Sequence, residues 1–315
     1  MQYDRVERVP LGGFRQKIHI LGQAAENPVL LFLHGGPGIP DRGGLMERHR
    51  ALAKDFTIVA WDQRGTGGSY RGVDPATLTV DRLVEDAAEL AAYLCRTLGR
   101  EKIFICGGSW GTELGTFLAH RHPEHIAAYV GSGQVVNGVR NEELSYSFCV
   151  RAAREAGDAR ALAVLEKVGP PVRGQYAGGF DGLMAQRNIL KKYGGHSLKN
   201  RGGFFRTYAK PILRSKEYTP GDVWGILRGY KLTLSTMWPT VVDYDFVHSR
   251  NTFAMPYFIF QGRHDQNTPS DLIEEYFAAI QAPRKELIWF EQSAHGPMVE
   301  EKDTFYRLLR EKLLA

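Results

Sequence analysis

The strongest chemical signal in this chain is one short run around a serine. Residues 107–111 read GGSWG, so Ser109 lies two positions from a glycine on either side. This G-x-S-x-G pattern is typical of a sharp turn between a strand and a helix, which exposes the serine hydroxyl as a nucleophile. The glycines permit the strained backbone of that turn. A glycine-rich turn with an incidental serine is the alternative, but the apolar run before the motif and the helical pattern after it favour a nucleophile.

A serine hydroxyl is a weak nucleophile unless a nearby base removes its proton, and an acid orients that base. His295 fits the base because it follows the apolar run at residues 287–290 and precedes a Gly-Pro turn. Asp265 fits the acid because it follows the preceding apolar run, at residues 256–260. The order Ser, Asp, His along the chain is that of the α/β-hydrolase fold. The predicted catalytic residues are therefore Ser109, Asp265 and His295.

The acid has alternatives elsewhere in the chain. Some hydrolases of this fold place it after an earlier strand, but that loop here reads GSGQ at residues 131–134 and has no carboxylate. Asp243 and Asp245 lie in a later region that is mainly helical, and they fit the position less well. Asp265 is therefore preferred.

A tetrahedral intermediate at the serine would carry a negative oxygen that needs N–H donors. Residues 34–38 read HGGPG and follow an apolar run, which is where a loop with such donors belongs. The N–H of Gly35 or Gly36 is predicted as one donor, and the N–H of Trp110, at the start of the helix after the nucleophile, as the other. His34 is expected to brace this loop by hydrogen bonding rather than to act as a base.

Strands and helices that would position these residues alternate along the chain. Short apolar runs bounded by turn residues are typical of strands buried on both faces of a sheet, and they predict strands at residues 17–20, 29–33, 56–61, 103–106, 126–130, 256–260 and 287–290. Apolar residues at helical spacing predict helices at residues 80–98, 110–122, 270–280 and 302–314. The first of these helices has Thr79 as its N-cap and Gly99 at its end. Such alternation predicts an α/β fold with a mostly parallel central sheet and flanking helices.

Residues 135–247 follow a different pattern. Helical segments with many Arg and Lys residues alternate there with glycine pairs, and no strong strand signal occurs. We interpret this region as a mainly helical cap domain. The α/β-hydrolase core domain is then formed by residues 1–134 and 248–315, with the cap inserted between its two parts.

Composition and charge exclude several classes of protein. Hydrophobic residues make up 43% and charged residues 24% of the 315, as in ordinary globular proteins. The net charge of +5 is spread over 40 basic and 35 acidic residues, so no nucleic-acid partner is expected. No apolar stretch is long enough for a membrane span and no secretory signal begins the chain, so no membrane association and a cytoplasmic location are expected. The three cysteines match no metal motif, and no metal or cofactor is predicted. Nothing in the sequence specifies an oligomeric state.

Three segments together resemble one family, the prolyl iminopeptidase (proline aminopeptidase) family: HGGPG at residues 34–38, DQRGTGGS at residues 62–69 and GGSWG at residues 107–111. Together and at this spacing they are far more specific than G-x-S-x-G alone. The resemblance spans about residues 28–130 and returns at Asp265 and His295. It implies a cofactor-free serine peptidase that removes an N-terminal residue, typically proline, from short peptides.

In that family, carboxylates of the cap pair with the α-amino group of the substrate, within a stretch that carries a Trp-Glu pair. The present cap has no Trp-Glu pair, because Trp238 is followed by proline. The candidate substrate-binding residues are therefore Glu142, Glu143, Trp238 and Asp243, each of which could equally be an ordinary surface or core residue.

Three functions are compatible with these residues. The first is removal of an N-terminal proline or similar residue from small peptides or amides through an acyl-enzyme. The second is a carboxylesterase, amidase or lactonase that uses the same three residues on a small-molecule substrate. The third is a ligand receptor that does not catalyse a reaction, since a fold alone never proves catalysis. The intact set of Ser109, Asp265 and His295 argues against the third.

Overall fold

The computed structural model describes residues 2–199 and 218–314. Its strands are β1 (Tyr3–Leu11), β2 (Phe14–Gly22), β3 (Val29–Leu33), β4 (Thr57–Asp62), β5 (Ile103–Gly108), β6 (Ile126–Ser132), β7 (Tyr257–Gly262) and β8 (Lys285–Phe290). Its described α-helices are α1 (Arg42–Arg48), α2 (Val80–Leu98), α3 (Trp110–Arg121), α4 (Gly138–Glu155), α5 (Ala159–Val168), α6 (Phe180–Lys192), α8 (Pro220–Val241), α9 (Phe246–Ser249), α10 (Ile273–Ala279), α11 (Pro297–Glu300) and α12 (Lys302–Leu313).

The eight strands form one sheet in the order β1-β2-β4-β3-β5-β6-β7-β8. Strands β3 to β8 are parallel to one another, whereas β1 and β2 form an antiparallel hairpin that pairs with β4. Because parallel strands end at the same edge, the loops after β3, β5, β7 and β8 meet at one edge of the sheet. These are the loops that carry the predicted catalytic and oxyanion-hole residues. The predicted α/β fold with a mostly parallel sheet is confirmed.

Most core elements agree with their predicted positions. Strand β3 and helix α2 have the predicted bounds, and α2 begins with the Thr79 side chain accepting a hydrogen bond from the N–H of Arg82. The helix ends at Gly99, which has a left-handed backbone (φ 63°, ψ 44°), as expected for its role. The predicted helix at residues 270–280 is shorter, because it starts with the 3-10 turn η6 (Ser270–Leu272) before α10.

The elements of the core that were not predicted include β1, α1 and α11. Strand β1 lies at an edge of the sheet and alternates exposed with half-buried residues over most of its length, so it lacks the apolar run of a central strand. The predicted strand at residues 17–20 is the central part of the longer β2. Helix α11 has only one turn, which is too short for a helical periodicity to be visible in the sequence.

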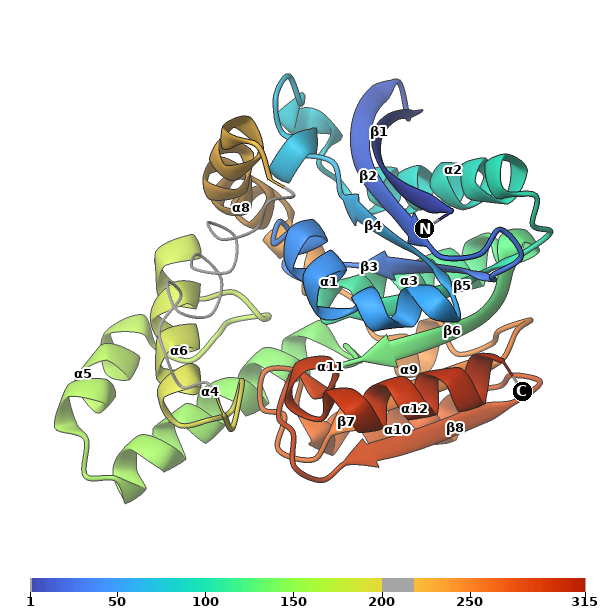
Figure 1. Ribbon diagram of the computed structural model, residues 1–315. Coiled ribbons are helices and arrows are strands. Elements are labelled where there is room, and N and C mark those ends of the chain that lie inside the picture. The colour runs from blue at the N-terminus through green and yellow to red at the C-terminus, as the bar shows by residue number, and fades with distance from the viewer. Residues whose placement is uncertain (1, 200–217, 315) are drawn as a thin grey trace.

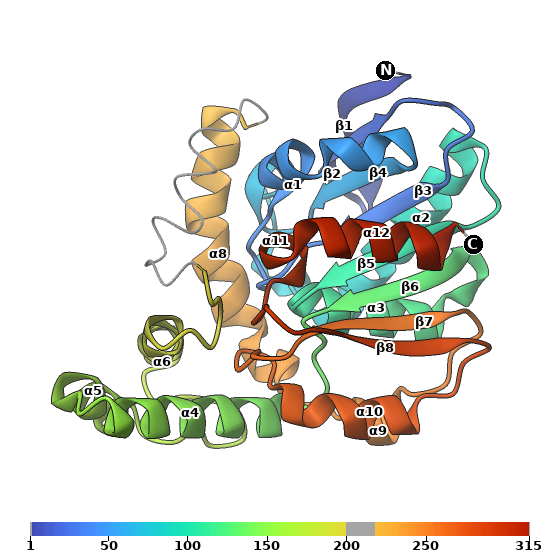
Figure 2. The same cartoon turned by 60° about the horizontal axis from the view of Figure 1, so that its bottom comes forward.

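Helices cover both faces of the sheet (Figure 2). Side chains of α2, α3 and α10 pack against one face, in the larger of the two core clusters. Side chains of α1 and α12 pack against the other, including the fully buried Phe305. This burial on two faces explains why the central strands are continuous apolar runs.

Helices α4, α5, α6 and α8, between β6 and β7, gather beside the sheet, whereas α9 lies next to α10 (Figure 1 and Figure 2). The segment that leaves the sheet after β6 is hydrogen-bonded to the segment that returns before β7. The N–H of Phe246 donates to the carbonyl of Val136, and the N–H of Gly138 donates to the carbonyl of Tyr244. The chain therefore leaves for α4–α8 and returns from them side by side. The two-domain division at residues 135–247 stays a prediction, and residues 200–217 of the predicted cap lie outside the described residues.

A buried ionic network joins helix α8 to the core. Asp222, in the first turn of α8, accepts hydrogen bonds from Lys17 Nζ (2.7 Å) and Arg42 Nη2 (2.9 Å). Arg42 also donates from Nε to Asp62 Oδ2 (3.2 Å), and Asp62 begins the DQRG segment singled out in the sequence. Breaking one partner of such a buried pair is costly because an uncompensated charge remains. The network thereby holds the start of α8 against the core.

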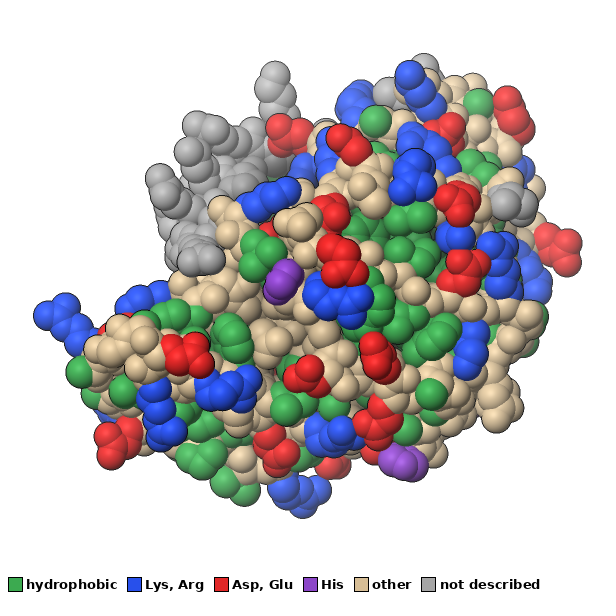
Figure 3. Space-filling view, turned by 90° about the horizontal axis from the view of Figure 1, so that it is seen from below, with side chains coloured by type: hydrophobic (Ala, Val, Ile, Leu, Met, Phe, Trp, Pro, Cys, Tyr) green, Lys and Arg blue, Asp and Glu red, His purple; other side chains and the backbone are tan. Residues whose placement is uncertain are grey.

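On the surface seen in Figure 3, acidic and basic side chains of the described residues lie interspersed. Within residues 2–199 and 218–314, no helix has both the length and the apolar composition needed to cross a lipid bilayer.

Candidate active site

Ser109 occupies the sharp turn between β5 and α3. Its backbone (φ 55°, ψ −124°) lies in a region that residues with a side chain rarely adopt. The glycines around it have a steric reason, because a Cβ at Gly111 would overlap the carbonyl oxygen of Leu33, and one at Gly107 would overlap that of Gly111. The turn therefore requires glycine at both positions and holds the serine at the carboxyl end of β5.

Asp265 and His295 lie together at the same edge of the sheet. The Nδ1 atom of His295 is 2.8 Å from Oδ2 of Asp265, which is fully buried. The carboxylate is also held by the backbone N–H groups of Asn267 (2.8 Å) and Thr268 (2.9 Å), which both reach Oδ1. Oδ2 additionally accepts hydrogen bonds from the Thr268 hydroxyl (2.7 Å) and from Gln261 Nε2 (3.1 Å). An acid so fully bonded keeps the imidazole in one orientation.

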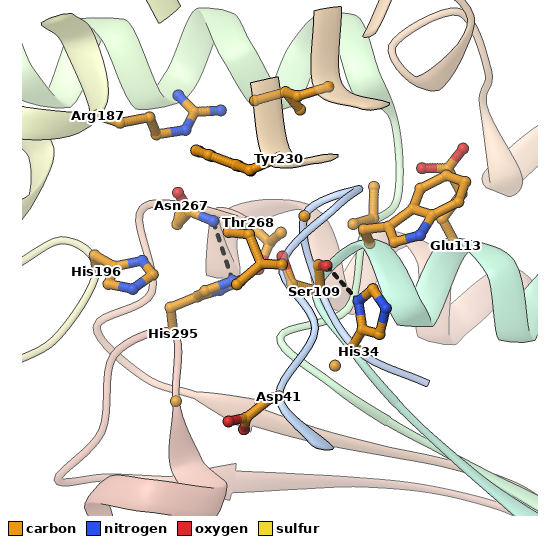
Figure 4. A pocket seen from close by; sticks show the side chains of 18 of the residues that line it. His34, Asp41, Ser109, Glu113, Arg187, His196, Tyr230, Asn267, Thr268 and His295 are labelled. Atoms are coloured by element: carbon orange, nitrogen blue, oxygen red, sulfur yellow. Dashed lines mark hydrogen bonds between the residues drawn. The ribbon is translucent and has the colours of Figure 1, made fainter. Parts of the chain in front are cut away.

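The second ring nitrogen of His295 is also paired. Its Nε2 atom lies 3.0 Å from Nδ2 of Asn267 (Figure 4). Ser109 and His295 line the same cavity, but the hydrogen bonds of the described residues include none between the Ser109 hydroxyl and His295. The structure thus brings Ser109, Asp265 and His295 to one edge of the sheet, with Asn267 holding the nitrogen that would face the serine.

The HGGPG loop after β3 lies beside Ser109. A Cβ at Gly35 would be 3.2 Å from Cβ of Ser109, so this close approach favours glycine there. Gly36 has a left-handed φ of 124°, which also favours glycine. Trp110 is the first residue of α3, and the N–H groups in a helix's first turn have no partner within the helix. The three predicted oxyanion-hole residues are therefore neighbours of the serine.

His34 braces this loop, as expected from the sequence. Its Nδ1 atom is 2.9 Å from the carbonyl of Gly35, and its Nε2 atom accepts a hydrogen bond from the N–H of Gln63 (3.2 Å). Gln63 in turn accepts a hydrogen bond from the indole Nε1 of Trp110 (2.9 Å). Burial lowers the pKa of His34 to about 4, partly opposed by its bond to Gly35. The imidazole is therefore neutral at pH 7 and serves as a structural link.

A cavity of about 770 Å³ connects Ser109 to the cap helices. It is bounded by the HGGPG loop, the start of α3, and the inward faces of α4, α6 and α8. Most of its lining on α6 and α8 is apolar, with Leu183, Met184, Ile226, Leu234 and Trp238 among the residues. Its size is typical of a site for a small-molecule or short-peptide ligand.

Three buried acceptor atoms that line this cavity have no hydrogen-bond partner among the described residues. They are Oε1 of Glu113, Oδ1 of Asn141 and Oε2 of Glu142. The three side chains belong to residues that are 0%, 5% and 1% exposed, respectively. Because buried acceptors without a donor are costly, such a cluster favours a ligand that supplies donors, such as an ammonium group.

The two carboxyl groups in this cluster differ in their surroundings. Burial raises the pKa of Glu113 well above its usual value, and Tyr244 donates a hydrogen bond to its Oε2. Glu142 forms an ion pair from its Oε1 with Nη2 of Arg187 at 2.5 Å. Lys191 follows one turn after Arg187 on α6, and burial together with the Arg187 charge lowers its pKa to about 8.

The structure brings only some of the predicted substrate-binding residues to the cavity. Glu142 and Trp238 line it, and the indole Nε1 of Trp238 donates to the carbonyl of Gly174 (3.2 Å). Glu143 is exposed and faces away from the residues that line the cavity. Asp243 is 63% exposed in its side chain and pairs with Arg173, so it too lies outside the cavity. The physical reason is helical geometry, because adjacent residues such as Glu142 and Glu143 point in different directions.

The two weaker candidates for the acid have other partners. Asp245 caps α9 and contacts His248 (2.8 Å), while Asp243 forms its surface ion pair with Arg173. Asp265 is the carboxylate that contacts His295.

Several site residues were not found from the sequence. Asn267 and Thr268 lie in the loop of the predicted acid, so their position was a usable signal. Glu113 was visible too, since it lies four residues after Ser109 and a glutamate in an otherwise apolar helix is unusual. Arg187 had no local signal, because its partner Glu142 is 45 positions away in the chain.

Within residues 2–199 and 218–314, no group of three or more His, Cys, Asp or Glu side chains could hold a metal ion.

Comparison with known proteins identifies the family. A family model described as alpha/beta hydrolase fold matches residues 28–302. A relative named "Probable aminopeptidase YbaC" from Bacillus subtilis (strain 168) is 28% identical over 306 residues, which cover 96% of this chain and 94% of that protein. A "Proline iminopeptidase" from Heyndrickxia coagulans is 24% identical over 284 residues, covering 90% and 88%.

A solved structure has the same fold. The crystal structure of proline iminopeptidase from Mycobacterium smegmatis has a TM-score of 0.67 and 18% identity, and the match covers 98% of this chain and 97% of that chain. The resemblance to proline iminopeptidases inferred from the three sequence motifs is therefore confirmed.

Proposed function

This chain belongs to the alpha/beta hydrolase fold family, and from that premise we propose that it is a serine hydrolase with Ser109 as its nucleophile. The observation that carries the proposal is the contact between buried Asp265 and His295 at the sheet edge that also presents Ser109 to the cavity. The names of relatives that are 24–28% identical support a substrate from which an N-terminal residue is removed.

The proposed reaction has two stages. In the first, the Ser109 hydroxyl attacks the carbonyl of the substrate while its proton passes to Nε2 of His295. The N–H of Trp110 and that of Gly35 or Gly36 bind the resulting oxyanion. The imidazolium then gives its proton to the leaving amine. In the second stage, water hydrolyses the acyl-enzyme with His295 again as base.

For the substrate, we propose a small peptide or amide with a free N-terminal amino group, such as an N-terminal proline. The unpartnered acceptors Oε2 of Glu142, Oδ1 of Asn141 and Oε1 of Glu113 support this choice, since an ammonium group would supply their missing donors. Of the four residues expected to bind substrate, Glu142 is the best supported and Trp238 is a candidate wall of the pocket.

One observation favours a second candidate, an esterase, amidase or lactonase for neutral small molecules. Arg187 already balances the charge of Glu142, and the walls of the cavity on α6 and α8 are mainly apolar. A substrate without an ammonium group would fit such walls and use the same three catalytic residues.

The test compares hydrolysis of proline β-naphthylamide with that of p-nitrophenyl acetate and butyrate, with Ser109→Ala as control. The aminopeptidase proposal expects proline amide turnover well above that of the esters, all of it lost in the Ser109→Ala variant. Turnover of esters alone would reassign the protein to the second candidate. Turnover that persists without the Ser109 hydroxyl would refute the nucleophile.

The amino-group site has a matched pair of variants. Glu142→Gln removes the charge beside the cavity, and Glu143→Gln makes the same change on the exposed neighbouring residue. In Glu142→Gln, the substrate should lose a charge-assisted hydrogen bond worth about 1.5–3 kcal/mol. This loss should lower kcat/KM for the proline amide by about 10- to 100-fold. Labelling of Ser109 by a fluorophosphonate should be unchanged in both variants, which controls for folding. Equal loss in the two variants, or no loss in either, would remove Glu142 from the substrate site.

A further inference from the structure

Both ring nitrogens of His295 are held by one loop of four residues. Asp265 contacts Nδ1 at 2.8 Å, and Asn267, two residues later, contacts Nε2 at 3.0 Å. The loop is rigid in this arrangement, because the carboxylate of Asp265 also accepts the backbone N–H groups of Asn267 and Thr268. The imidazole is therefore clamped at both nitrogens.

The chemistry of the two contacts sets their direction. Next to a carboxylate, Nδ1 carries the ring proton and donates it to Asp265. In a neutral imidazole Nε2 then has only a lone pair, which accepts a hydrogen bond from the amide Nδ2 of Asn267. This is the same lone pair that must accept the proton of Ser109 during catalysis. Asn267 and the substrate-bound serine therefore compete for one atom.

The loop is also tied to the cap. The side-chain Nδ2 of Asn141, on α4, lies 2.9 Å from the backbone carbonyl of Asn267 and 3.0 Å from Oε1 of Glu142. One cap side chain thus contacts both the proposed amino-group site and the residue that holds His295. In Figure 4, Asn267 lies between His295 and the residues Arg187 and Tyr230, and all four line the same cavity.

We propose that Asn267 is a positioning residue that holds the Nε2 atom of His295 away from Ser109 until a substrate displaces its amide. The inference rests on the proposed function, since it requires Ser109 and His295 to act as nucleophile and base. When the amide moves away, the freed lone pair accepts the proton of Ser109 as its oxygen bonds to the substrate carbonyl. Without substrate, the serine lacks its base and is a poor nucleophile.

The experiment measures the second-order rate of Ser109 labelling by a small fluorophosphonate, which does not depend on the natural substrate. Asn267→Ala removes the competing donor. A single neutral hydrogen bond is worth about 0.5–1.5 kcal/mol, so labelling should become about 2- to 10-fold faster. Gln266→Ala, one residue earlier in the same loop, is the control, and its rate should equal that of the unsubstituted protein.

Asn267→Asp provides a second readout, the pH profile, which a side chain away from Nε2 would not move. A carboxylate beside Nε2 stabilises the imidazolium, so the apparent pKa of the labelling rate should rise by about one unit or more. The other titratable or charged groups near His295 are the same in both proteins. They include Asp265 on its Nδ1 side, His196 with its ring 5.1 Å away, and Arg187, Lys191 and Glu300, which line the same cavity.

The outcomes separate the two proposals. Absence of labelling in both the unsubstituted protein and Asn267→Ala would refute Ser109 as nucleophile and thus the proposed function itself. Labelling of the unsubstituted protein, with an equal or slower rate in Asn267→Ala, would leave the proposed function intact and overturn the role of Asn267. An unchanged pH profile in Asn267→Asp would overturn that role as well.

Discussion

Replacing Asp265 by asparagine tests the proposed site most directly, because the surroundings of the carboxylate dictate how an amide would be oriented. Oδ1 accepts two backbone N–H groups, which cannot turn to become acceptors. The oxygen of the new side-chain amide would therefore take the position of Oδ1, and its NH₂ group would take that of Oδ2. The NH₂ group would then face Nδ1 of His295 as a donor.

This orientation changes the tautomer of His295. A donor opposite Nδ1 makes that nitrogen an acceptor, which moves the ring proton to Nε2. An Nε2 that carries a proton cannot accept one from Ser109. A wrong tautomer of this kind lowers kcat by about 10⁴-fold in serine hydrolases with this set of residues.

The same change leaves other donors unsatisfied at the buried site. Gln261 Nε2 donates to Oδ2 of Asp265, and it cannot simply turn over because its Oε1 accepts the N–H of Gln134 (3.0 Å). An unsatisfied buried donor costs about 1–3 kcal/mol, so unfolding in urea should shift measurably while the protein still folds.

The assay is kcat on whichever substrate the unsubstituted protein hydrolyses, together with a urea unfolding curve. Asp243→Asn is the matched control, since Asp243 is a surface carboxylate and a rival candidate for the acid. A folded Asp265→Asn protein that keeps a tenth or more of the activity would refute the tautomer argument. A large loss in Asp243→Asn instead would transfer the role of the acid.

Three further predictions concern the support of the site. Gly111→Ala places a Cβ against the carbonyl oxygen of Leu33 and should destabilise the fold by about 3 kcal/mol or more. Gly108→Ala is the control, because a Cβ there has open space around it, and its urea midpoint should be nearly unchanged. Equal midpoints for the two variants would refute the steric argument. The pKa of His34 is lowered to about 4 from 6.5, so the unfolded chain binds its proton first, and stability falls by about 3 kcal/mol in total as the pH falls from 6.5 through 4. Urea titrations at pH 7 and 4.5 should show that this pH dependence is weaker in His34→Gln. Thr268→Val removes a hydroxyl that donates to Asp265, and kcat should fall by about 10-fold with little change in KM; a change confined to KM would contradict this role.

Local signals predicted the fold of the core and located the loops that carry the proposed catalytic residues. The strands β3 to β7 are largely buried on both faces, so each produces an apolar run with a visible end, and the half-buried edge strand β8 still ends in the apolar run at residues 287–290. Since parallel strands end at one edge, the position of Ser109, Asp265 and His295 after three such runs was enough to bring them together. The hairpin strand β1 was missed because only one of its faces is covered for most of its length.

The walls of the cavity could not be predicted in this way. Glu142 and Arg187 contact each other across two helices, and no periodicity within either helix reveals a partner in the other. Of the adjacent acids Glu142 and Glu143, only the first is buried, and this depends on the rotation of α4 about its axis. The sequence shows that charged residues are present in this region, whereas the packing of helices determines which of them face a substrate.

In the proposed function, different parts of the chain supply chemistry and selectivity, and the side chain of Asn141 contacts both parts. Its side chain joins Glu142, in the proposed amino-group site, to the backbone of the loop that holds both nitrogens of His295. We expect a ligand that engages Oε2 of Glu142 or Oδ1 of Asn141 to shift this contact, and the shift would act on Asn267 rather than on the carboxylate of Asp265, which has several hydrogen-bond donors. Substrate recognition would then release the base only when the amino-group site is filled. It follows that Asn141→Ala should lower the preference for a proline amide over an ester through kcat as well as KM, and a change in KM alone would show that the two sites act independently.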